Sequence, residues 1–405
     1  MSRETTIIVG AGQAGANAAI AIREAGYPGH ILLLGDEAHA PYERPPLSKA
    51  ALTGEALPAA THFHPQPRYA ERDITLLLGV AAIGLDPAAG RLHMADGRAL
   101  AFDQLLLATG GRARRLTGHG SARALSLRTL DDAHALRRQI LGSRPLVCIG
   151  AGVIGLEVAS SARARGGAVT VIEAAARVMG RAATEHIADR LTRLHRDHGV
   201  RLLLGTAVAA IEDAHVACAD GTLIAADTVV AGIGMDRNLA LAEQAGLEID
   251  GGIVVDAWGA TSAPGIFAAG DVAAFWHPRL ARRLRLESWR HAQNHGIAVG
   301  RVMAGGREPY DEVPWFWTDQ HGVNLQVAGL PDDAMTAVFR GDPEGDSFSV
   351  FHLDADGRML GATGWNAPRD VRAGTMLIGA GRPVEPATLR DASANLQSYA
   401  KQVAR

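Results

Sequence analysis

The sequence predicts an α/β fold with two Rossmann-like domains and a C-terminal α+β domain. A G-x-G-x-x-G turn at residues 10–15 directly follows an apolar strand and opens a helical segment. The same pattern recurs at residues 150–155, about 140 residues later. From Pro314 onward, the pattern changes to antiparallel strands within 323–366, followed by helical segments at 368–381 and 386–404. Strand–helix alternation is typical of parallel sheets, whereas strands followed by helices indicate an α+β domain.

The first unit has the residues of a dinucleotide site. Gly10, Gly12 and Gly15 follow the strand "TIIV". The first glycine of such a motif forms the tight turn, the second lets a pyrophosphate approach the backbone, and the third lets helix and strand pack closely. The phosphate then lies at the helix N-terminus. Asp36 follows the next strand, 21 residues after Gly15, where an acid accepts hydrogen bonds from ribose hydroxyls.

The second unit repeats this arrangement. Its turn consists of Gly150, Gly152 and Gly155. Glu173 ends the next strand, 18 residues after the last glycine. An acid there hydrogen-bonds a free 2′-hydroxyl and repels a 2′-phosphate, which favours NADH over NADPH. Arg177 and Arg181 follow closely and could accept a phosphate, so strict selectivity is not predicted. Two such sites suggest one bound flavin and one diffusible nicotinamide, but their spacing does not decide which unit holds which.

Composition and charge argue against several classes of protein. The 405 residues are enough for two or three domains. The net charge of −3 provides no global basic field for nucleic acid. No run approaches the length of an uncharged transmembrane helix, so no membrane span is expected. The N-terminus resembles no signal peptide, and Cys148 and Cys218 form no CxxC motif, so we expect a cytoplasmic protein.

Several motifs, in order along nearly the whole chain, resemble the FAD-dependent ferredoxin reductases of bacterial oxygenase systems. Besides the first glycine turn, they are "YERPPLSK", "LLLATGGRARRL", "LRTLDDA", "GAGVIGLE", "IFAAGDV", "ESWRHAQNHG" and "PWFWTDQ". The resemblance implies a glutathione-reductase fold and electron transfer from NADH through FAD to a [2Fe-2S] ferredoxin, which feeds a Rieske-type dioxygenase or a haem monooxygenase. Relatives of apoptosis-inducing factor share the fold and flavin, so a partner-binding role is the alternative. The sequence shows neither the basic surface nor the targeting segments expected for that role.

The same resemblance implies three domains. The FAD-binding domain is discontinuous, at 1–111 and 238–312, the NADH-binding domain lies at 112–237, and the α+β interface domain lies at 313–405. The terminal oxygenase, its substrate and the oligomeric state are left open.

The resemblance also assigns cofactor contacts residue by residue. The first glycine turn and Asp36 hold the FAD pyrophosphate and adenosine ribose. The further implied FAD contacts are Ala14, Arg44, Lys49, Ala82, Thr109, Gly110, Arg128, Asp271, Trp289 and Trp317. Asp271 is implied to bind the ribityl hydroxyls, although Asp is also a good helix N-cap. The second glycine turn holds NADH together with Glu157 and Glu173.

Lys49 and Glu157 are the predicted catalytic residues. Lys49 ends the proline-rich stretch "AHAPYERPPLSK", whose rigid backbone can aim side chains. The resemblance places Lys49 near flavin N5, where a cation stabilises the negative charge that arrives with hydride. It places Glu157 beside the nicotinamide, within reach of Lys49. The alternatives are a solvated surface turn for Lys49 and a helix-dipole interaction for Glu157.

The sequence gives little indication of thiol chemistry or of a metal site. No cysteine precedes Cys148, whereas disulfide reductases of this fold need one near the flavin. His62 with His64, and His291 with His295, have metal-like spacing but no obvious third ligand, so no metal site is predicted.

A cluster of arginines suggests a docking surface. Five arginines lie within residues 279–290 of a net-negative chain. We predict that some of them, Arg282, Arg283 and Arg285 among them, bind an acidic ferredoxin. The alternative is a solvated loop whose arginines pair with local carboxylates.

Overall fold

The computed structural model describes residues 3–54, 63–140 and 144–405. His62 lies outside these residues. The chain forms two compact units. In their described parts, the first comprises 3–44, 63–112 and 235–312, and the second comprises 45–54, 113–140, 144–234 and 313–405. No helix within the described ranges is both long and apolar enough to span a membrane.

The first unit is built on a parallel sheet with the strand order β18-β7-β1-β2-β3. These strands are β1 (Thr5–Val9), β2 (His30–Gly35), β3 (Ile74–Leu78), β7 (Gln104–Leu107) and β18 (Ile266–Ala268). In β1, Ile7 lies opposite Leu32 on one side and Leu105 on the other. Ile7 and Leu105 are fully buried, as expected where helices cover both faces of a parallel sheet. The predicted strands "TIIV" and "HILLLG" are confirmed.

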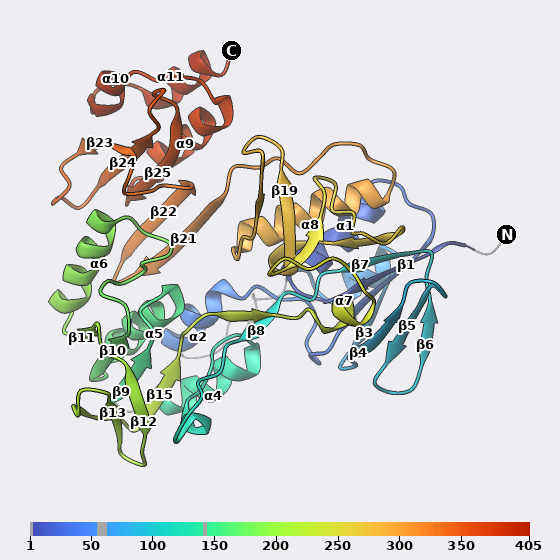
Figure 1. Cartoon of the computed structure of the whole chain (residues 1–405), viewed down its shortest axis with the longest axis horizontal. Helices are drawn as coiled ribbons and strands as arrows, with labels where there is room; N and C mark the ends of the chain where they lie inside the picture. Colours follow the sequence, from blue (N-terminus) through green and yellow to red (C-terminus); the bar gives the residue numbers. More distant parts are fainter. Residues whose placement is uncertain (1–2, 55–62, 141–143) are drawn as a thin grey trace. The chain divides into compact units, whose positions relative to one another are not determined.

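Two helices pack closely in this unit because glycines line their contact. α1 (Gln13–Glu24) and α8 (Trp289–Met303) run side by side (Figure 1). A Cβ on Gly296 would lie 2.3 Å from the Ala14 carbonyl oxygen, and a Cβ on Gly300 would lie 2.7 Å from that of Ala18. The contact therefore requires glycine at both positions, and it fixes the N-terminal turn of α1.

Smaller elements complete the first unit. β4 (Ala82–Asp86), β5 (Arg91–Met94) and β6 (Ala99–Ala101) form an antiparallel sheet. β17 (Ile253–Val255), β19 (Ala273–His277) and β20 (Arg282–Leu284) form another small sheet. The remaining elements are α3 (Pro67–Glu71), α7 (Ala240–Gln244) and the 3₁₀ turn η4 (Gly270–Val272). β8 (Gly111–Ala113) and β16 (Met235–Arg237) lie where the chain leaves this unit and returns to it.

His291 and His295 are buried structural residues on α8. The His291 ring stacks on Phe275, with centroids 4.9 Å apart, and its Nδ1 lies 3.1 Å from the Tyr310 hydroxyl. Burial lowers the pKa of His291 to about 4 and lowers the pKa of His295 well below its ordinary value. In the described part of the chain, no group of three or more His, Cys, Asp or Glu side chains is arranged to hold a metal.

We expect the protein to lose stability as the pH falls from about 6.5 towards 4. His291 stays neutral in the folded protein down to about pH 4 but takes up a proton near its ordinary pKa when unfolded. Its contribution to the free energy of unfolding, on the order of 3 kcal/mol, is present above about pH 6.5 and is lost on acidification. Urea unfolding at about pH 7.5, 6 and 5 checks this, and His291→Gln should weaken the pH dependence. Equal stability at all three pH values would contradict it.

The second unit contains a four-stranded parallel sheet with the order β11-β10-β9-β15. Its strands are β9 (Leu146–Ile149), β10 (Val169–Glu173), β11 (Arg201–Leu204) and β15 (Thr228–Ala231). The accompanying helices are η3 (Ser121–Arg123), α4 (Leu130–Ile140), α5 (Val153–Ala164) and α6 (Glu185–Asp197). An antiparallel sheet is formed by β12 (Val208–Ile211), β13 (His215–Cys218) and β14 (Leu223–Ala225). Cys148 is fully buried in β9.

The second unit also contains a five-stranded antiparallel sheet with the order β21-β22-β25-β24-β23. These strands are β21 (Trp315–Gln320), β22 (Val323–Gly329), β23 (Thr336–Gly341), β24 (Phe348–Leu353) and β25 (Met359–Trp365). α9 (Pro368–Ala380) packs against β22 and β25 (Figure 1). The predicted α+β pattern of this segment is confirmed.

The last predicted helical segment is divided into α10 (Pro386–Arg390) and α11 (Leu396–Val403). Asn395 ends the break, because its side chain accepts a hydrogen bond from the Ser398 N–H at 3.0 Å and caps α11. Arg340 donates to main-chain carbonyls within the break, including that of Ala394 at 2.8 Å. These side-chain contacts replace the hydrogen bonds of a continuous helix.

Candidate functional site

The first glycine turn has the geometry that a bound pyrophosphate requires. Gly10 has a φ of +112°, and a Cβ there would lie 2.2 Å from the Ala108 carbonyl oxygen. A Cβ on Gly15 would lie 1.9 Å from the Gly10 carbonyl oxygen. A Cβ on Gly12 would meet no described atom within 4 Å. Gly12 caps α1, so open space lies beside the helix N-terminus, where anions bind favourably, and a pyrophosphate there stays a prediction.

Other predicted FAD contacts lie at the carboxyl ends of strands in the same unit. Asp36 follows β2, Thr109 follows β7, and Asp271 in η4 follows β18. Ligands of parallel sheets bind at this edge. Asn238 holds the turn at Thr109 and Gly110, because its main-chain oxygen accepts from the Thr109 hydroxyl at 2.9 Å and its main-chain N–H donates to Gly110.

The remaining predicted FAD contacts are more scattered. Ala14 is buried in α1, Ala82 begins β4, and Trp289 is the first residue of α8. Arg128 belongs to the second unit, where its main-chain N–H donates to Asp132 at 2.9 Å, just before α4.

Arg44 is held by partners that sequence reasoning missed. Its guanidinium donates to the Glu37 carboxylate at 2.7 Å and lies over the Tyr42 ring, 5.2 Å from the centroid. The Tyr42 hydroxyl donates to the other Glu37 oxygen at 2.5 Å. The sequence did contain a signal for Glu37, because this acid directly follows the predicted ribose ligand Asp36. A pyrophosphate contact by Arg44 stays a prediction.

The second glycine turn repeats the geometry of the first. Gly150 has a φ of +99°, and a Cβ on Gly155 would lie 1.9 Å from the Gly150 carbonyl oxygen. The described atom nearest to a Cβ on Gly152 would be 3.9 Å away. Glu173, at the end of β10, accepts hydrogen bonds from the main-chain N–H groups of Ala151 at 2.7 Å and Ala175 at 2.8 Å. Its carboxylate is therefore anchored beside the turn.

The proline-rich stretch leads into the 3₁₀ turn η1 (Pro45–Ser48) and the short helix α2 (Ala50–Thr53). Proline is tolerated in a first helical turn. Side chains from neighbouring helices hold this segment. The Ser161 hydroxyl donates to the Ser48 carbonyl at 2.7 Å, and Arg165 donates to the Thr53 carbonyl at 2.8 Å. Lys49, between η1 and α2, thus stands on fixed backbone.

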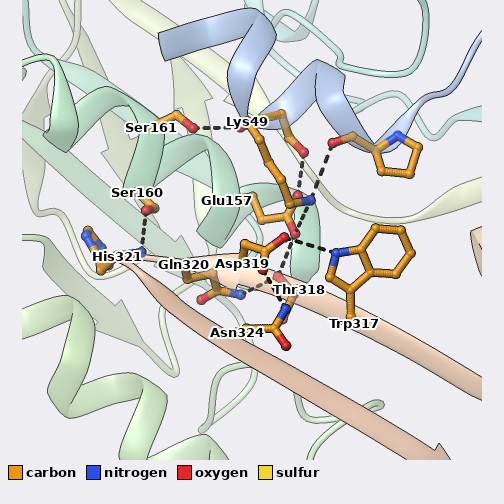
Figure 2. Close-up of polar contacts among 12 residues, drawn as sticks. Lys49, Glu157, Ser160, Ser161, Trp317, Thr318, Asp319, Gln320, His321 and Asn324 are labelled. Carbon is orange, nitrogen blue, oxygen red and sulfur yellow. Dashed lines mark hydrogen bonds and ion pairs between the residues drawn. The ribbon is translucent and has the colours of Figure 1, made fainter. Parts of the chain in front are cut away.

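The structure brings Lys49 and Glu157 together (Figure 2). Lys49 Nζ lies 2.8 Å from Glu157 Oε1, and the Glu157 side chain is only 2% exposed. The Thr318 hydroxyl donates to Oε1 at 2.6 Å, and the Ser48 hydroxyl donates to Oε2. A buried charge requires this kind of compensation, since removing one partner of a buried pair is strongly destabilising.

Trp317 lies beside this ion pair. Lys49 Nζ is 5.8 Å from the centroid of the Trp317 ring, and the indole N–H donates to Asp319 at 3.0 Å. Asn324 donates to the other oxygen of Asp319 at 2.7 Å. The predictions missed Asp319, and also Ser48 and Thr318. Alternation along β21 could have indicated that Asp319 lies on the same face as Trp317 and Thr318 on the opposite face, because successive side chains of a strand point to opposite faces.

The two cysteines are poorly suited to thiol chemistry. Burial raises the pKa of Cys148 to about 12. Burial and the nearby Asp220 raise the pKa of Cys218. A thiol with a raised pKa forms little thiolate, which is the reactive form.

Four of the five clustered arginines lie close to carboxylates. Arg283 and Arg285 lie 3.7 and 3.5 Å from the carboxylate of Asp250. Arg279 lies 2.6 Å from Asp311, and Arg290 lies 3.8 Å from Glu312. These pairs support the alternative of local carboxylate partners. Arg282 is exposed on β20.

Comparison with known proteins identifies the family. Residues 4–296 match the family model described as pyridine nucleotide-disulphide oxidoreductase. The chain belongs to this family. Residues 315–400 of this oxidoreductase match a second model, described as the reductase C-terminal domain.

Individual relatives narrow the comparison. The oxidoreductase is 40% identical, over 97% of its length and 98% of the relative's, to the ferredoxin–NAD(+) reductase component of the p-cumate 2,3-dioxygenase system of Pseudomonas putida. It resembles the crystal structure of a ferredoxin reductase for the CYP199A2 system from Rhodopseudomonas palustris, with a TM-score of 0.95 and 37% sequence identity. The match covers 98% of this chain and 100% of that chain. It also resembles the reductase in the covalent putidaredoxin reductase–putidaredoxin complex (TM-score 0.95, 36% identity, 100% and 99% coverage).

These matches confirm the predicted resemblance to ferredoxin reductases, the glutathione-reductase type of fold and the oxidoreductase class.

Proposed function

We propose that this oxidoreductase passes electrons from NADH through bound FAD to a [2Fe-2S] ferredoxin that feeds an oxygenase. The family and its ferredoxin–NAD(+) reductase members imply FAD and NAD(H). Relatives named as a dioxygenase component and as a putidaredoxin complex support a ferredoxin as the acceptor. A cytoplasmic location stays a prediction.

The two glycine turns divide the cofactors between them in this proposal. FAD would bind to 1–111 and 238–312, with its pyrophosphate at Gly12, its adenosine ribose near Asp36 and its ribityl hydroxyls near Asp271. NADH binds to 112–237, with its pyrophosphate at Gly152. The segment 313–405 supplies Trp317 and Thr318. FAD held by these residues would supply a hydride acceptor that can pass on its electrons singly.

The observation that carries the mechanism is the ion pair of Lys49 with the buried Glu157. The ammonium is paired at 2.8 Å and held by fixed backbone, so it is oriented before any substrate arrives. A fixed cation stabilises charge that develops during hydride transfer without reorganising first. Glu157 and the hydroxyl groups of Ser48 and Thr318 keep the ammonium in place.

Anaerobic reduction by NADH tests the function. Rapid bleaching of the flavin, followed by reduction of an added [2Fe-2S] ferredoxin, is the expected result. Slow bleaching with no transfer to any ferredoxin would favour the partner-binding role of apoptosis-inducing-factor relatives.

We predict that replacing Arg282, Arg283 and Arg285 together with Glu lowers ferredoxin turnover at low salt and weakens its dependence on ionic strength. Exposed charges at a docking surface act mainly on the association rate, which salt screens. Reduction of the flavin by NADH should stay normal. The matched control replaces Arg369, Arg372 and Arg382, all exposed, with Glu, which changes the net charge equally. An unchanged salt response in the first variant would place docking elsewhere.

A further inference from the structure

A buried chain of hydrogen bonds continues from Glu157 Oε1, the oxygen that also contacts Lys49. The Thr318 hydroxyl bonds to Glu157 at 2.6 Å, and the Gln320 amide nitrogen donates to the Thr318 oxygen at 2.9 Å. His195 Nε2 lies 2.8 Å from the Gln320 amide oxygen, and His195 Nδ1 lies 3.2 Å from Nε2 of His321. Thr318, Gln320 and His195 are at most 2% exposed. Figure 2 shows Thr318 and Gln320 on β21 and His321 just after its end.

The two histidines at the outer end are neutral. Burial lowers the pKa of His195. Burial lowers the pKa of His321 to about 3, and the positive charge of Arg163 acts in the same direction. His198 stacks on His321, with centroids 4.2 Å apart, and so faces this end of the chain. A neutral imidazole has one N–H donor and one acceptor nitrogen.

Because each neutral imidazole has one donor and one acceptor, the hydrogen-bond chain has a single donor-to-acceptor direction. Because Gln320 Oε1 can only accept, His195 carries its proton on Nε2 and accepts from His321 through Nδ1. The Thr318 oxygen accepts from Gln320, so its one hydrogen is left for Glu157. Every donor therefore points towards the carboxylate. In the reverse direction, the Thr318 and Glu157 oxygens would face each other at 2.6 Å without a hydrogen, unless Glu157 carried a proton.

We propose that Gln320 and His195 are positioning residues for the Lys49–Glu157 pair, because they hold the Thr318 hydroxyl as a donor to Glu157 and so keep this buried carboxylate charged. Hydrogen bonds to a charged form favour that form. Without this donor, a proton can pass from Lys49 Nζ to Glu157 Oε1, which leaves a neutral amine and a neutral acid. The cation on which hydride transfer depends is then lost. This inference rests on the proposed function of Lys49.

The direct test is the tautomer of His195 in the FAD-loaded protein, read from ¹⁵N NMR of labelled histidine. In the wild type, the proton is expected on Nε2. Thr318→Val removes the acceptor of the Gln320 amide, which becomes free to turn, so His195 should populate both tautomers. Thr318→Ser keeps the hydroxyl and should restore the wild-type spectrum. A His195 signal that is the same in Thr318→Val as in the wild type would overturn the proposal.

A second measurement separates positioning from mere structural support. His195→Phe, which removes the donor to Gln320, should move the pH at which flavin reduction by NADH falls to half its maximum on the alkaline side downward by about one unit, because Lys49 then loses its proton more easily. His195→Gln retains a donor and should restore the profile. An equal loss of rate at every pH would indicate only a structural role. The NMR result does not depend on ferredoxin reduction. An error in the proposed function can therefore be distinguished from an error in the proposed hydrogen-bond chain.

Discussion

Lys49→Met is expected to slow the reduction of bound flavin by NADH about ten- to a hundredfold, while FAD stays bound. The substitution removes a charge-assisted interaction of roughly 1.5–3 kcal/mol with the charge that develops on the flavin. It also leaves Glu157 buried without its cation, although the hydroxyl groups of Ser48 and Thr318 remain. Stopped-flow absorbance measures the rate, and the bound flavin spectrum measures FAD content.

The sequence provides a matched control for this variant. Lys401, on α11, is exposed and is the only other lysine of the chain. Lys401→Met removes the same charge and should leave the rate of flavin reduction unchanged. The double variant Lys49→Met with Glu157→Gln should be more stable than Lys49→Met, because no unpaired buried charge is left. A wild-type bleaching rate in Lys49→Met would mean that Lys49 is only a solvated residue of a turn.

Glu173→Ala is expected to raise the KM for NADH about tenfold and to reduce the preference over NADPH. The variant removes the acceptor proposed for the ribose hydroxyls. It also removes the acceptor of the Ala151 and Ala175 N–H groups, so the glycine turn loses support at the same time. Steady-state kinetics with both coenzymes measure the effect.

Glu173→Gln separates these two contributions. The amide keeps an oxygen that can accept from the turn, but it no longer repels a 2′-phosphate. We expect this variant to improve use of NADPH while it keeps more of the NADH activity than Glu173→Ala. A wild type that prefers NADPH would show that the ribose assignment is wrong.

The parts of the molecule that the sequence predicted well depend on local signals. Each glycine turn is contained within one strand–turn–helix segment, and its steric demands act over a few residues. The close contacts at Gly15 and Gly155 are of this kind. The strands after Pro314 were predicted too, because apolar runs separated by turn residues are also a local signal.

The missed features depend on residues distant in sequence. Thr318 lies 161 positions from Glu157, and Gln320 lies 125 positions from His195. No local pattern could reveal these contacts. The contacts of the arginine cluster are also between residues distant in sequence, since counting charges cannot show that Asp250 lies beside both Arg283 and Arg285.

The ion pair of Lys49 has a practical consequence for chemical labelling. Lysine occupies only positions 49 and 401 among the 40 lysines and arginines of the chain. Reagents that acylate amines therefore have two side-chain targets besides the α-amino group. Lys401 is exposed, whereas the Lys49 side chain is only 22% exposed and is paired with Glu157 at 2.8 Å, so we expect Lys49 to be acylated more slowly. Mass spectrometry of the two acylated peptides thus reports how far the ion pair protects Lys49, with Lys401 as the internal standard in the same molecule.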